Sequence, residues 1–192
     1  RAHLGAVLFA LCIERILVYR PNDFDSAAFL VSLGQELEVA VSWDFGADPD
    51  VADWMRRWAS ETGAGYETAY AEVVQEAKDG LRLVWRMLSD DVTDDQALDA
   101  LGCKAPESRS SGMTTVLGAI YLALKNASHP VQAVTSAVNC LSTDSDSIAA
   151  FVGAMMGALH GHFVIPDRWK SVQDAEYLER IALDLAAVAF GE

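Results

Sequence analysis

The sequence predicts an all-α fold, a compact multi-helix bundle of about nine helices. Apolar residues recur at spacings of three and four along most of the 192 residues, which is typical of amphipathic helices. No segment alternates apolar and polar residues as a half-buried strand does, and no hairpin dipeptide separates two apolar runs. Because the sequence also lacks an internal repeat and a low-complexity linker, we expect residues 1–192 to form a single all-helical domain.

The first half of the chain contains four of the expected helices. Asp23 or Asp25 is placed to cap the second of them, and glycine and proline interrupt the pattern over Asp44–Pro49. Trp54 and Trp58 lie four residues apart, so their rings are expected to stack on one face of the third helix. These four helices are expected over Ala2–Val18, Ser26–Val41, Asp50–Ser60 and Tyr66–Leu88.

The second half contains five more. Thr93-Asp94-Asp95 is a typical helix cap, and Pro130 suits the first turn of a helix. Between two of these helices, the small and polar stretch Gly102–Ser111 is irregular and suited to line a site. The helices are expected over Thr93–Ala100, Gly112–Lys125, Pro130–Cys140, Ser147–Leu159 and Asp174–Ala189.

The charge of the chain restricts its partners. With 14 Lys and Arg against 28 Asp and Glu, the formal net charge is −14. Non-specific binding to nucleic acid needs clustered Lys and Arg, so we do not expect it. A small ligand that carries phosphate remains compatible with this charge if a cation lies between the two sets of negative groups.

Neither a disulfide framework nor a membrane span is predicted. The three cysteines lie far apart and form no C-x-x-C pair, which favours small buried side chains in a reducing, cytoplasmic environment. The longest apolar runs, Leu4–Ile13 and Ile148–Leu159, are shorter than the ~20 residues that a bilayer requires.

The segment that carries chemistry lies just before the helix expected at Ser147–Leu159. Asp144 and Asp146 alternate with hydroxyl residues there, and such oxygen donors suit hard cations such as Mg²⁺. The alternative is that Asp146 or Ser147 caps the helix while Asp144 interacts with its dipole. The residues alone leave both interpretations open.

The helix that follows is unusually rich in glycine. Gly153, Gly157 and Gly161 recur every four residues. Glycine inside a helix costs about 1 kcal/mol relative to alanine, so three glycines on one face favour the close approach of another helix. We therefore expect a rigid, buried helix whose first turn presents acidic groups to a cleft.

Three consecutive blocks carry a resemblance to a known family. Ser142–Ser147, Ile148–Gly161 and Ile165–Trp169 match in order and spacing a Gly-Gly-Asp-Thr-Asp-Thr segment, a small-residue helix and an Ile/Val-Pro-x-x-Trp segment. This pattern resembles the ADP-ribosylglycohydrolases, which include the ADP-ribosyl-acceptor hydrolases and the dinitrogenase reductase-activating glycohydrolase. Upstream, Gly102–Ser108 is similar to the family's Gly-x-x-Ala-x-Glu-Ser stretch.

The resemblance implies an enzyme that cleaves the glycosidic bond between ADP-ribose and an acceptor. It implies two adjacent Mg²⁺ ions at the cleft, with Asp144, Asp146 and Ser147 as metal ligands. It also implies that Ser111 and Gly112 border the ribose of the substrate. ADP-ribose or an ADP-ribosylated molecule is therefore the expected partner.

The chain also departs from the family pattern. Ser142-Thr143 stands where the family has Gly-Gly, and an early catalytic acid and a Thr-Asp-Asp-Thr segment are not found. Thr93-Asp94-Asp95 is similar to the latter segment but lies beside the Gly102 stretch, so we interpret it as a helix cap. These departures predict that the chain is the C-terminal part of such a domain. They also favour the alternative of a catalytically inactive module that binds ADP-ribose or a protein.

Overall fold

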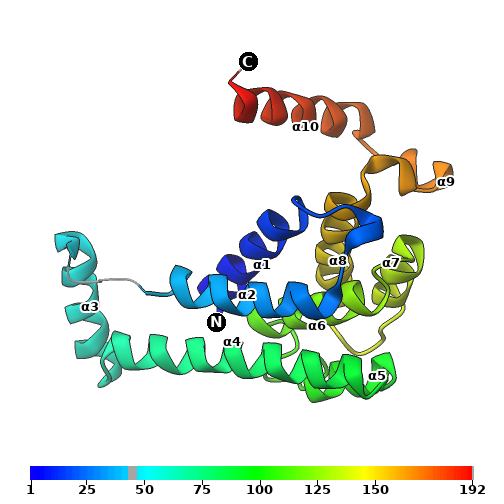
Figure 1. Cartoon of the computed structure of the whole chain (residues 1–192). Helices are drawn as coiled ribbons and strands as arrows, with labels where there is room; N and C mark the ends of the chain where they lie inside the picture. Colours follow the sequence, from blue (N-terminus) through cyan, green and yellow to red (C-terminus); the bar gives the residue numbers. More distant parts are fainter. Residues whose placement is uncertain (43–46, 192) are drawn as a thin grey trace.

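The computed structural model describes residues 1–42 and 47–191, and over these residues the protein is built from α-helices and short 3₁₀ turns without strands (Figure 1). The all-α prediction is confirmed. The elements in chain order are α1 (Ala2–Ile16), η1 (Pro21–Asp23), α2 (Ser26–Ala40), α3 (Pro49–Thr62), α4 (Tyr66–Ser89), α5 (Asp94–Ala100), α6 (Gly112–Lys125), α7 (Pro130–Val138), α8 (Ser145–His160), η3 (His162–Val164), α9 (Asp167–Lys170) and α10 (Ala175–Phe190).

Local capping chemistry determines where several of these helices begin. The Asp25 side chain accepts hydrogen bonds from the amides of Ala27 and Ala28, so it caps α2, whereas Asp23 belongs to η1. Thr93 and Gln96 form a reciprocal capping box at α5. The predicted break over Asp44–Pro49 falls mostly outside the described residues, but Asp48 caps α3 and Pro49 is its first residue.

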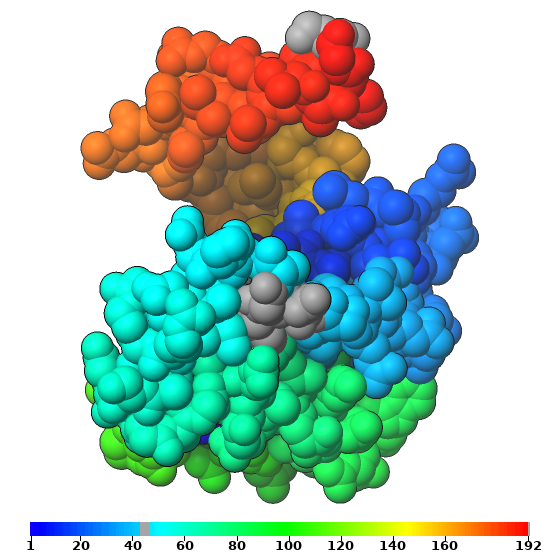
Figure 2. Space-filling view, turned by 90° about the vertical axis from the view of Figure 1, so that its left-hand side faces the viewer, coloured from blue at the N-terminus to red at the C-terminus, as the bar shows by residue number. Residues whose placement is uncertain are grey.

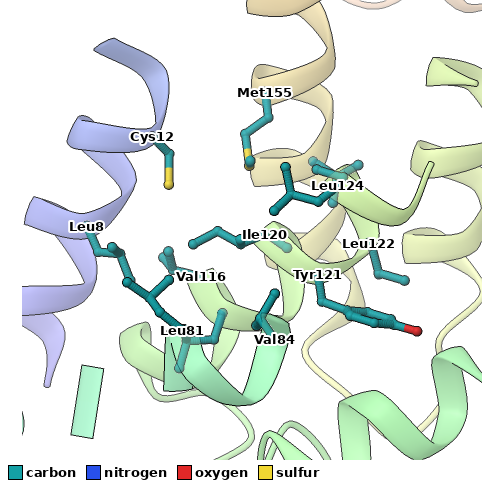
Figure 3. Close-up of a cluster of buried hydrophobic side chains, with 14 of the residues drawn as sticks. Leu8, Cys12, Leu81, Val84, Val116, Ile120, Tyr121, Leu122, Leu124 and Met155 are labelled. Carbon is teal, nitrogen blue, oxygen red and sulfur yellow. The ribbon is translucent and has the colours of Figure 1, made fainter. Parts of the chain in front are cut away.

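Helix α6 is the centre of the hydrophobic core. Each of its residues from Met113 to Leu124 is buried, because α1, α4, α7 and α8 all pack around it. Figure 3 shows Leu8 and Cys12 of α1 and Met155 of α8 pointing toward the α6 side chains. A helix that is apolar on all sides is stable only when it is covered on all sides. The surrounding helices therefore pack against α6.

The closest helix approach is at α1 and α6, and not along the glycines of α8. A Cβ atom added at Gly5 would lie 2.6 Å from the backbone of Gly112, so these two helices meet backbone to backbone. At Gly153 and Gly157 an added Cβ would meet no atom within 4 Å. The prediction that another helix packs closely on the α8 glycines is therefore wrong. Gly161 instead ends α8, with a φ of +79°.

Two helices lie at the periphery (Figures 1 and 2). Helix α3 contacts the start of α4 through rings, with Trp54 and Trp58 centred 5.7 Å apart and Tyr66 4.7 Å from Trp54. The two tryptophans meet on one face of α3 as predicted, but their ring planes are tilted by 42° and are not stacked in parallel. Helix α10 stands apart from the bundle and has no buried residue. None of the described helices combines the length and the apolar character needed to cross a bilayer.

Candidate functional site

The predicted metal ligands lie where α8 begins. Asp144 is the residue that precedes the helix, and Asp146 and Ser147 belong to its first turn. Asp144 and Ser147 are half-buried, whereas Asp146 is exposed. The sequence therefore places all three on one short segment, between the end of α7 and the N-terminus of α8.

The two aspartates are close enough to interact directly. The pKa of Asp146 is lowered, first by a hydrogen bond from the Asp144 side chain and then by hydrogen bonds from the backbone amides of Asp146 and Ser147. Two carboxyl groups in such contact share a proton or a cation, because two bare carboxylates at that separation repel each other. The two carboxyl groups are thus neighbours at the start of α8.

The predicted capping role is only partly correct. The helix begins two residues earlier than expected, so the N-cap position belongs to Asp144 and not to Asp146 or Ser147. The Asp144 side chain nevertheless makes no capping hydrogen bond. The positive end of the α8 dipole lies beside this segment and favours negative charge there, and no described backbone amide is capped by the Asp144 carboxyl group.

Ser111 and Gly112, the predicted ribose-bordering residues, lie at the start of α6. The Ser111 hydroxyl oxygen is shielded from solvent and makes no hydrogen bond. Gly112 is pressed against α1, because a Cβ added there would lie 3.2 Å from the Cα of Ala2. The close packing of α1 thus supplies a structural reason for glycine at this position.

The length of α6 separates Ser111 and Gly112 from Asp144 and Asp146. Ile148, in the first turn of α8, would lie 3.6 Å from a Cβ added at Gly118 of α6. Gly118 is six residues beyond Gly112, which is about 9 Å along the helix axis. Among the described residues, the Ser111 hydroxyl makes no hydrogen bond and Gly112 packs against Ala2, so Ser111 and Gly112 lie apart from Asp144 and Asp146.

A cavity of about 480 Å³ lies beside residues 139–141, just before Asp144 in the sequence. Asn139, Cys140 and Leu141 line it from the loop, and Thr135 and Ser136 line it from α7. The opposite wall comes from Asp94, Asp95 and Leu98 of α5 and from Lys104. Small-molecule sites typically enclose about 300–1,000 Å³, so this cavity is of a suitable size.

Ion pairs neutralise the acids of this cavity. Lys104 pairs with Asp95, and Lys125 donates to Asp94 at 3.0 Å and to the Tyr121 hydroxyl at 3.1 Å. Burial works against the charge on Lys125, but its hydrogen bonds to Tyr121 and Asp94 outweigh it and raise the pKa. Sequence reasoning assigned Asp94 and Asp95 to a cap alone and missed their place in this wall. The sequence feature that could have indicated this cavity is the small, polar stretch 102–111, because its Lys104 lines the same wall as Asp94 and Asp95.

The thiols of the chain are not nucleophiles at neutral pH. Burial and the nearby charge of Asp94 raise the pKa of Cys140 to about 11, and burial raises the pKa of Cys103 to about 12. Cys12 and Cys103 are buried and reduced, and Cys140 is half-buried. A thiol needs a lowered pKa to react, so chemistry at this cavity depends on oxygen and nitrogen groups.

The aspartate pair has no third metal ligand of the usual kind nearby. Within residues 1–42 and 47–191, no group of three or more His, Cys, Asp or Glu side chains is placed to hold a metal ion. The His160 Nε2 donates a hydrogen bond of 2.7 Å to the carbonyl oxygen of Ala127, which connects the end of α8 to the α6–α7 turn. The assignment of Asp144, Asp146 and Ser147 as metal ligands therefore stays a prediction.

Comparison with known proteins adds the family. The family model of the ADP-ribosylglycohydrolases matches residues 1–192. Neither the curated proteins nor the solved structures gave a significant match. The match includes helices α1 and α6, which meet at Gly5 and Gly112. It also includes Asp144 and Asp146 at the start of α8 and the residues Pro166–Trp169 after that helix. On this evidence the chain belongs to the ADP-ribosylglycohydrolase family.

Proposed function

We propose that this chain is a Mg²⁺-dependent hydrolase that cleaves the glycosidic bond between ADP-ribose and an acceptor. The observation that carries the proposal is the position of Asp144, Asp146 and Ser147 at the N-terminus of α8, in a chain that the family model matches over residues 1–192. Family membership supports glycohydrolase activity in general, and the adjacent cavity of about 480 Å³ supports binding of a small polar ligand there.

The donor set at α8 fits part of the coordination shell of Mg²⁺. This ion prefers six oxygen ligands and commonly binds one or two carboxylates together with water and substrate oxygens. Asp144 and Asp146 would supply the carboxylates and Ser147 the hydroxyl. The remaining positions would be filled by water, by substrate hydroxyls or by groups other than the described side chains. The family pattern of two ions implies the same.

The roles of the residues follow from charge and position. A bound Mg²⁺ would supply positive charge that orients ribose hydroxyls and a water molecule. Asp144 and Asp146 would present negative charge toward the oxocarbenium-like carbon that forms as the glycosidic bond breaks. Ser111 and Gly112 would border the ribose from the start of α6.

Turnover of an ADP-ribosylated peptide tests the catalytic part of the proposal. We expect Asp144→Asn and Asp146→Asn each to lower turnover by about a hundredfold or more, because each removes a charge from the reacting centre. Asp50→Asn is the matched control, since Asp50 is also an exposed aspartate in the first turn of a helix. Equal activity in all four proteins would contradict the assignment.

Calorimetric titration with Mg²⁺ and ADP-ribose separates the two functional classes. An enzyme of this kind binds both ligands and turns over substrate, whereas an inactive module binds ADP-ribose or a protein without turnover. A chain that binds neither ligand would contradict both the enzyme and a module that binds ADP-ribose.

Ser111→Ala tests the ribose side without a confounding loss of stability. The Ser111 hydroxyl makes no hydrogen bond in the structure, so its removal should change the free energy of unfolding by less than about 0.5 kcal/mol. If this hydroxyl contacts the ribose, the affinity for ADP-ribose falls while the denaturation midpoint stays the same. Unchanged affinity in the variant would remove Ser111 from the site.

A further inference from the structure

Helix α10 presents an apolar face that the described residues leave without a buried side chain. It has 16 residues and none of them is buried. At 100° per residue, one side of the helix is apolar and is flanked by Glu179 on one edge and Asp184 on the other. The helix carries three acids, Glu176, Glu179 and Asp184, against one base, Arg180. The residues of the apolar face are Leu178, Ile181, Leu185 and Val188.

A groove of complementary character lies between α2 and α4. Its volume is about 620 Å³, and Leu30 and Leu81 form part of its apolar surface. Val31 and Trp85 are 51% and 41% exposed there, and a Cβ added at Gly34 would meet no atom within 4 Å. The groove is thus open and in part apolar, and an amphipathic helix can dock on such a surface with its apolar face.

The rim of this groove is basic in a strongly acidic protein. Lys78, Arg82 and Arg86 of α4 line it, with Glu38 the only acid among its lining residues. These three residues recur every four positions, so they follow one edge of α4. The structure pairs Lys78 with Glu38 and Arg82 with Asp79, and it shows no salt-bridge partner for Arg86 among the residues it describes.

The groove cannot be filled by α10 of the same chain without a large rearrangement. Helix α1 packs against α2, α4 and α8, and α10 stands on the far side of α1 from the groove (Figures 1 and 2). Only residues 171–174 separate α9 from α10, and four extended residues span at most about 14 Å. A second molecule has no such restriction.

We propose that α10 of a second copy of this chain binds in the groove between α2 and α4. Its apolar face covers Leu30, Leu81 and Trp85, and its flanking acids face Arg82 and Arg86. Because each copy has both the helix and the groove, two copies exchange helices around a twofold axis. The exchange buries two equivalent contacts and closes the assembly as a dimer.

A second groove, lined by Val131 and Val134 of α7 and by Gly153 and Gly157 of α8, is the weaker candidate for binding α10. It is smaller, at about 300 Å³, and its lining residues include no charged side chain that would select an acidic helix. It therefore offers apolar contact without charge complementarity.

Sedimentation equilibrium of the full chain tests the proposal. We expect a mass of twice 20.8 kDa at micromolar concentrations, and Leu185→Asp should weaken the dimer roughly tenfold or more by placing a charge in the contact. Leu183→Asp is the matched control, because Leu183 is equally exposed, 65% against 66%, but lies on the polar side of α10. A monomer up to the solubility limit, or equal effects of the two variants, would overturn the proposal.

A second pair of variants tests the groove and the charges. Gly34→Leu should fill the groove without disturbing the fold, since the position is open, and it should also abolish the dimer. Arg86→Glu should weaken association, and mixing it with Asp184→Lys should restore a mixed dimer. If the dimer survives Gly34→Leu, or if the charge exchange restores nothing, α10 does not bind in this groove.

Discussion

At the residue scale, Ser142 shows how a single backbone angle affects the aspartate loop. Its φ is +66°, in the left-handed region where a side chain is unfavourable for all residues except glycine. The corresponding family segment has glycine at this position. The serine therefore stores strain two residues before Asp144, in a loop whose neighbouring Thr143 hydroxyl donates to the carbonyl oxygen of Cys140 at 2.7 Å.

Ser142→Gly is expected to stabilise the protein by about 0.5–1 kcal/mol, because the relief of left-handed strain exceeds the added chain entropy of glycine. The measurement is the midpoint of urea denaturation. Ser136→Gly, within α7, is the control, and there glycine should destabilise by a similar amount. A lower midpoint for Ser142→Gly would show that the left-handed angle carries no strain.

The contact between Asp144 and Asp146 predicts a titration. The pKa of Asp146 is lowered from 3.8 chiefly by the Asp144 side chain. Because the folded pKa lies below the unfolded one, the stabilisation is present above about pH 4 and is lost as the pH falls through the lowered pKa. Asp144→Ala should move the pKa of Asp146 back toward 3.8, as measured by carboxyl carbon NMR.

Asp167 provides the internal control for that titration. Its pKa is also lowered, but by its hydrogen bond and charge interaction with Lys170. It should therefore not change in Asp144→Ala. If the pKa of Asp146 also stays low, the two aspartates do not interact in solution.

At the scale of elements, replacing a glycine by alanine is expected to change stability in opposite directions in α1 and in α8. Gly5 lets α1 meet α6 at backbone distance, whereas Gly153 of α8 borders the smaller, open groove. Gly5→Ala should destabilise the protein by about 1–3 kcal/mol, because the added carbon must separate two packed backbones. Gly153→Ala should stabilise it by about 0.5–1 kcal/mol through helix propensity alone.

Thermal unfolding of the two glycine variants measures this difference. Both substitutions add the same methyl group to a helix interior, so each is the control for the other. A destabilised Gly153→Ala would indicate that α8 is covered by another helix in solution.

At the scale of the whole molecule, a net charge of −14 opposes compaction through self-repulsion. Salt should therefore raise the thermal midpoint by screening. MgCl₂ should raise it further than NaCl at the same ionic strength, because a bound cation stabilises the folded state by mass action. The excess effect of Mg²⁺ should disappear in Asp144→Asn but persist in Asp50→Asn, and its absence in the unmutated chain would contradict a Mg²⁺ site.

Much of the fold could be predicted from local patterns. The Thr93 capping box and the Trp54–Trp58 ring contact involve residues within four positions of each other, so their signals lie in short windows of sequence. The convergence of Asp144 and Asp146 was predictable for the same reason. Helix α9 was not expected as a helix, because four residues after a proline give too short a periodic signal.

The sequence by itself determined the helical class, most helix positions and the acidic pair at α8, since these depend on neighbours along the chain. Only the tertiary structure decided that Gly5 and Gly112, rather than Gly153 and Gly157, mark the close helix contact. It also decided that Asp94, Lys104 and Cys140 line one cavity, and that no residue of α10 is buried by the described part of the chain. Which faces of the helices meet depends on how all of them pack around α6, and no local pattern contains that information.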